Sequence, residues 1–142
     1  MQLVIKQMEF LQKESAEKCL WFVLPDINRD IYDILELSKL FPKDLYNQRL
    51  RSDREMIIAS YSEKQYQSSA EDDVLALQDI ETIMVDMVHK YGEDITLLES
   101  SQSANTNKEK SCQILIDINK RFIVLPPEKS ARLYRYLMRQ MQ

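Results

Sequence analysis

Residues 69–92 decide the fold class of this chain, and they read SAEDDVLALQDIETIMVDMVHKYG. Seven apolar side chains of this stretch recur every three or four residues, which places them on one face of an amphipathic α-helix. They are Val74, Leu77, Ile80, Met84, Met87, Val88 and Tyr91. The pattern predicts a helix over 69–91.

Gly92 directly follows this stretch, where the C-terminus of a helix favours a residue in the left-handed conformation. It is the only glycine among the 142 residues, whereas the average usage of ~7% would give about ten. Hairpins and phosphate-binding loops need glycine for positive φ or for close backbone approach. The shortage therefore favours an all-α protein and argues against a glycine-rich phosphate site.

The start of the same helix carries its own signals. Ser68 and Glu71 have the spacing of a capping box, and acidic residues at 71–73 suit the exposed N–H groups of a first turn. Further apolar residues widen the helix face, so we expect this helix to lie at the centre of the fold; they are Leu75, Ile83 and Val85.

Working outward, prolines and polar stretches separate other periodic segments. We expect a single compact domain over 1–142 with five to six helices and polar loops near 62–69 and 100–111. The predicted helices cover 2–23, 27–41, 43–65, 69–91, 112–125 and 127–141.

One segment fits two structures. Residues 112–125 are rich in β-branched side chains, which suits strands as well as a buried helix. An α+β fold with a small antiparallel sheet from 19–24, 95–98 and 112–125 therefore stays open. The lack of a good hairpin turn favours the helix.

Composition describes a soluble globular protein, with 44% hydrophobic and 30% charged residues and a net charge of −4. The longest apolar run, 19–24, is too short to span a membrane, and we see no secretory signal in the first residues. The two cysteines, Cys19 and Cys112, lie in apolar contexts. We expect two buried reduced thiols rather than a disulfide, and hence a cytoplasmic or nuclear protein.

Charge is segregated along the chain. Residues 71–99 hold nine acidic residues against one lysine, whereas the C-terminal segment carries a basic strip beside Tyr136. The strip consists of Lys129, Arg132, Arg135 and Arg139, whose spacing of three, three and four sets them on one helix face. Such a strip could pair with the acidic segment of the same molecule or bind an anionic partner.

Signals for chemistry are weak. The sole histidine, His89, stands near a helix C-terminus, where it suits the helix dipole, and no residue near it in sequence supplies a nucleophile. Neighbouring acids at 71–73 point in different directions, so they cannot converge on one ion. We therefore expect no catalytic residue, no cofactor and no metal. An enzyme would need carboxylates from separate helices to converge, such as Asp79, Asp86 and Asp117.

These observations favour a non-enzymatic protein–protein interaction module, an adaptor or a regulatory subunit, whose partner is another protein or its own second copy. The expected partner-binding residues are Lys129, Arg132, Arg135, Tyr136 and Arg139. The alternative is an accessory nucleic-acid or phosphate-binding module that uses the same basic face, although the net negative charge argues against broad nucleic-acid binding.

Overall fold

The computed structural model describes residues 2–24, 31–61 and 68–140. In these ranges every regular element is a helix and no strand is found, so the all-α prediction is confirmed. The elements are α1 (Gln2–Glu14), α2 (Ala16–Val23), α3 (Ile31–Leu40), α4 (Lys43–Ser60), α5 (Ala70–Tyr91), the 3₁₀ helix η1 (Gly92–Leu98), α6 (Ser101–Thr106), α7 (Lys108–Val124) and α8 (Pro127–Gln140). The proposed sheet segments fall in α2, η1 and α7, so the α+β alternative is wrong. None of the described helices is long and apolar enough to cross a membrane.

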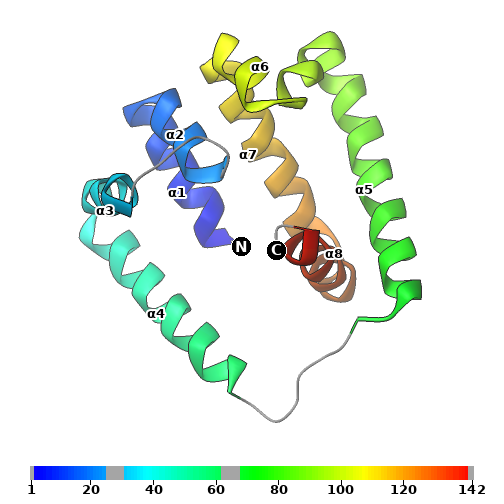
Figure 1. Ribbon diagram of the computed structural model, residues 1–142, viewed down its shortest axis with the longest axis horizontal. Helices are drawn as coiled ribbons and strands as arrows, with labels where there is room; N and C mark the ends of the chain where they lie inside the picture. Colours follow the sequence, from blue (N-terminus) through cyan, green and yellow to red (C-terminus); the bar gives the residue numbers. More distant parts are fainter. Residues whose placement is uncertain (1, 25–30, 62–67, 141–142) are drawn as a thin grey trace.

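Helix α7 lies at the centre of the arrangement (Figure 1). It contacts α1 and α2 on one side and α5 and α8 on the other, with α6 and η1 at its N-terminal end. Helix α5 packs on α8, η1 and α7 but runs along the edge of the molecule. The expectation that α5 is central is therefore wrong, because part of its wide apolar face points to solvent, including Val74 and Val85.

The core consists of two clusters that share α7. The first joins α1, α2, α3, α6 and α7, and its buried members include Met8, Leu11, Leu20, Leu37, Cys112 and Ile116. The second joins α5, α7 and α8, and its buried members are Ile83, Met87, Ile114, Phe122 and Leu133. Successive helical positions point to different sides, so α7 can fill both clusters at once.

Several predicted boundaries differ from the structure because polar residues cap helices. The predicted helix 2–23 is divided at Ser15, which is extended (φ −168°, ψ 126°) and precedes α2. The predicted loop 100–111 is helical instead: Ser100 caps α6 and Asn107 caps α7, each side chain accepting a hydrogen bond from a backbone N–H three residues on.

The other three predicted helices agree with the structure. The helices predicted at 27–41, 43–65 and 127–141 are observed as α3, α4 and α8. Parts of these predictions, and most of the predicted loop 62–69, lie at positions 25–30, 62–67 and 141, outside the described residues.

Helix α5 starts with a capping box one residue later than expected. The Ser69 hydroxyl accepts from the backbone N–H of Asp72, and the Asp72 carboxylate accepts from the backbone N–H of Ser69. Helix α5 ends at Gly92, whose φ of +57° lies in the region that favours glycine, as the sequence predicts.

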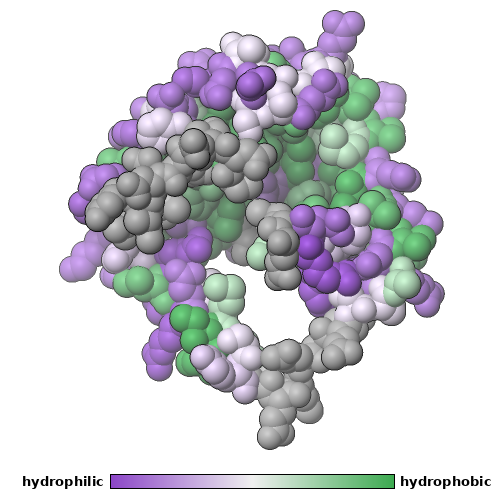
Figure 2. Space-filling model, viewed as in Figure 1, coloured by the Kyte–Doolittle hydropathy of each residue, from purple (hydrophilic) through white to green (hydrophobic). Residues whose placement is uncertain are grey.

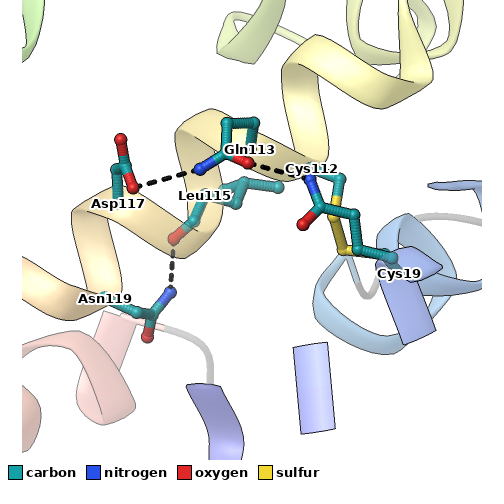
Figure 3. The surroundings of a disulfide bond; sticks show 7 residues. Cys19, Cys112, Gln113, Leu115, Asp117 and Asn119 are labelled. Carbon is teal, nitrogen blue, oxygen red and sulfur yellow. Dashed lines mark hydrogen bonds between the residues drawn. A yellow bond between two sulfur atoms is a disulfide. The ribbon is translucent and has the colours of Figure 1, made fainter. Parts of the chain in front are cut away.

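Cys19 on α2 and Cys112 on α7 form a disulfide (Figure 3). Both residues are fully buried in the first cluster. The expectation of two reduced thiols is therefore wrong, because the packing of α2 on α7 brings together cysteines that are 93 residues apart. The cytoplasmic or nuclear location was inferred from reduced thiols, and it stays a prediction without that support.

Candidate interaction surfaces

The basic strip of α8 faces α5. Lys129 Nζ and Arg132 Nη2 each donate to a different oxygen of the Asp79 carboxylate, both at 2.8 Å. Arg139 pairs with Asp73, which lies about one and two-thirds turns before Asp79 on α5. Arg135 and Tyr136, the other two predicted partner-binding residues, are half-buried on α8. The structure thus brings the acidic and basic segments together within one molecule.

Asp79 is the electrostatic centre of this contact, and its side chain is only 12% exposed. Burial alone would raise the pKa of its carboxyl group. Hydrogen bonds from Lys129 and Arg132, together with their positive charges, outweigh burial and lower the pKa of Asp79 below its usual value of 3.8. The strip therefore serves first to fix α8 against α5.

The carboxylates that an enzyme would have to gather are held apart in separate ion pairs. Asp86 pairs with Arg121 of α7 at 2.5 Å, whereas Asp117 accepts from Lys90 and from the Tyr91 hydroxyl. Burial acts to raise the pKa of Asp117, but these hydrogen bonds outweigh burial and lower it. Within residues 2–24, 31–61 and 68–140, no three His, Cys, Asp or Glu side chains are grouped so that they could hold a metal ion.

An open cleft of about 1060 Å³ lies between α4 on one side and α1, α7 and α8 on the other. Its α4 wall is polar and consists of Gln48, Arg51, Ser52 and Glu55. The facing wall is mainly apolar and includes Leu3, Ile123, Leu125, Ala131 and the ring of Tyr134. Figure 2 shows an opening between α4 and α8, through which the background is visible.

Tyr134 lines the apolar wall and also packs against the second core cluster. Its ring lies edge-on to the buried Phe122, with ring centroids 5.9 Å apart. Burial raises the pKa of the Tyr134 hydroxyl to about 12. The apolar wall of the cleft is therefore continuous with the second core cluster.

Helix α4 has no buried residue along its 18 residues. On the side turned away from the cleft it carries an outer stripe, which we define as Tyr46, Leu50, Ile57 and Tyr61. All four are exposed, Tyr61 by 86%. The periodicity that predicts this helix already contains the stripe, but only the structure shows that the stripe is left uncovered by the described elements.

The structure therefore offers two unfilled surfaces on α4, the cleft and the outer stripe, whereas the predicted strip is largely occupied by α5. No protein-family model, no curated protein and no solved structure matches this chain.

Proposed function

We propose that this chain is a non-enzymatic protein–protein interaction domain, an adaptor or regulatory subunit, that takes an amphipathic helix of a partner protein in the cleft between α4 and α8. The observation that carries the proposal is that α4 forms one wall of an open cleft while burying none of its own residues. Most helical stability in proteins comes from tertiary packing, so a helix of this length without buried residues is suited to packing against a partner.

The chemistry of the cleft supports a helical partner. One wall is polar and the other is apolar, which matches the two faces of an amphipathic helix. Its volume of about 1060 Å³ lies just above the range of about 300–1,000 Å³ that is typical of small-molecule sites. An inserted helix would cover Leu125 and Ala131 with its apolar face and meet Arg51 and Glu55 with its polar face.

The nucleic-acid alternative has less support. Binding phosphates through the strip would require Lys129 and Arg132 to leave Asp79, and Arg139 to leave Asp73. The Asp79 carboxylate, whose side chain is largely buried, would then be left without its counter-charges, which is unfavourable. We therefore assign the strip the role of holding α8 in place as the cleft wall.

The test uses the full chain as bait in an extract of its source cells, followed by identification and purification of the captured protein. Calorimetric titration then measures binding to the wild type and to Ala131→Trp, which fills the apolar wall. We expect Ala131→Trp to weaken binding at least about tenfold. Ala70→Trp is the matched control, because Ala70 is also an exposed helical alanine but lies outside the cleft.

Salt separates this proposal from the alternative. Binding that depends on the apolar wall of the cleft persists when salt is raised, whereas binding of phosphates by a basic strip falls linearly in log K with log salt concentration. Binding that is insensitive to Ala131→Trp, or that disappears with salt, contradicts the cleft proposal.

A further inference from the structure

The outer stripe of α4 is symmetric about the midpoint between Asp53 and Arg54. Leu50 and Ile57 lie at equal distances on either side of this midpoint along the helix, and Tyr46 and Tyr61 do so farther out. At 100° per residue these four side chains, with Asp53 and Arg54 between them, fall on one face. Reversing the helix end to end therefore places apolar positions on apolar positions and exchanges the two charges.

We propose that this face binds a second copy of the chain, with the two α4 helices antiparallel about a two-fold axis through that midpoint. Tyr46 then meets the partner's Tyr61, and Leu50 meets the partner's Ile57. A two-fold interface requires that each contact occur twice with the roles exchanged. The spacing of the stripe satisfies this requirement at every one of its positions.

Charge selects the antiparallel orientation. In that orientation Asp53 faces the partner's Arg54 and Arg54 faces the partner's Asp53, so two opposite-charge pairs form. A parallel alignment in the same register would set Asp53 against Asp53 and Arg54 against Arg54, and such like-charge contacts are costly. Asp53 already accepts from Arg49 of its own helix, at 2.8 and 3.0 Å, and a carboxylate retains lone pairs for a second donor.

The stripe offers apolar area for an interface of modest size. Its four members are 40–86% exposed. Taking about 200 Å² for a fully exposed large side chain, they offer roughly 460 Å² per subunit. A standard interface buries about 800 Å² per partner, so the stripe would supply the apolar centre and polar residues around it the remaining area.

This inference deepens the proposed function by naming a second copy as one partner of the domain. It nevertheless uses the opposite side of α4 from the cleft, whose α4 wall consists of Gln48, Arg51, Ser52 and Glu55. Ala131→Trp is therefore expected to leave self-association unchanged. Either assignment can fail while the other holds.

The first test is sedimentation equilibrium of the full chain from about 1 µM to about 300 µM, a range that reports micromolar dissociation constants. We expect a monomer–dimer equilibrium. We expect Ile57→Glu to raise the dimer dissociation constant about a hundredfold or more, because both subunits then place a glutamate in the interface. Val85→Glu on α5 is the matched control and should have no effect, because Val85 is 55% exposed where Ile57 is 56% exposed. Circular dichroism confirms that both variants fold.

A charge-exchange experiment tests the orientation without touching the apolar residues. Asp53→Arg and Arg54→Asp each create like-charge contacts in their own antiparallel dimers, so each variant alone should dimerise at least about tenfold more weakly. Mixed in equal amounts, the two variants form a heterodimer in which both charge pairs are restored, and dimerisation should return. The single variants report the orientation: a parallel dimer of the wild type already sets like charges together at both positions, so neither substitution alone would weaken it.

Three results would overturn the inference: a monomer at every concentration, a dimer insensitive to Ile57→Glu, or no recovery in the Asp53→Arg and Arg54→Asp mixture. Loss of the dimer in Val85→Glu but not in Ile57→Glu would also overturn it and would move the interface to α5. None of these results bears on binding in the cleft, which the Ala131→Trp variant reports separately.

Discussion

Asp79 of α5 and Arg132 of α8 form the least exposed ion pair among the described residues, with side chains 12% and 16% exposed and atoms 2.8 Å apart. Lys129 joins the same carboxylate. One acidic side chain of α5 therefore holds two cations of α8, and this contact fixes the helix that forms the apolar wall of the cleft.

Replacing Asp79 by Asn should lower the free energy of unfolding by about 1–3 kcal/mol, because Arg132 would be left largely buried without its counter-charge. Urea denaturation measures the change. Asp86→Asn is the control on the same helix: Asp86 also pairs with an arginine, but its side chain is 50% exposed, and exposed pairs contribute about 0–1 kcal/mol. Equal effects of the two substitutions would contradict the central role of Asp79.

Acid should destabilise the protein through the same carboxylates. The folded-state pKa values of Asp79 and Asp117 are lowered from 3.8, so their contributions to stability are fully present above the unfolded-state pKa and are lost as pH falls through the lower folded-state values. Urea midpoints measured between about pH 6 and about pH 2.5 should therefore drop below about pH 4. The combined Asp79→Asn and Asp117→Asn variant should be less stable at neutral pH and show a shallower drop. An unchanged slope in this variant would show that other groups dominate acid unfolding.

Reduction of the disulfide should also destabilise the fold. The bond between Cys19 and Cys112 closes a loop across a sequence separation of 93, for which the chain-entropy relation gives about 4–5 kcal/mol. We expect a reductant to lower the urea midpoint of the wild type and to leave unchanged that of the double variant Cys19→Ala, Cys112→Ala. The same chemistry tests the location: rapid alkylation of the protein in its source cells should find no free thiol if the bond is present there, and two labelled cysteines would support the reducing compartments inferred from the sequence.

Helix periodicity could be predicted from the sequence, because α5, α7 and α8 each carry apolar residues at regular spacing. The break at Ser15 could not, because the residues on both sides of it favour helix formation and only backbone geometry shows the extended residue. The polar segment 100–111 was misleading for a different reason. Ser100 and Asn107 are polar because they cap helices, and the same residue types are typical of loops.

The candidate sites show a similar division. Spacing correctly places Lys129, Arg132 and Arg139 on one face, and charge segregation suggests α5 as one of their partners. These cations could pair with acidic side chains of the same molecule or with an external anion. The choice depends on how two distant segments pack, and the sequence alone does not show that packing. The disulfide was missed for the same reason. The symmetric stripe of α4, in contrast, is a linear pattern, and a search for end-to-end symmetry would find it.

Because α7 fills both core clusters, the two halves of the protein share a single set of buried side chains on one helix. Ile114 and Ile116 are both almost fully buried. A substitution such as Ile114→Ala or Ile116→Ala therefore removes core contacts that no other helix supplies. Helix α7 gives Ile123 to the cleft wall but mainly fills the two clusters, so it should be the helix in which substitutions are least tolerated, whereas α4 should tolerate nearly any change that preserves helix formation, its outer stripe and its cleft wall.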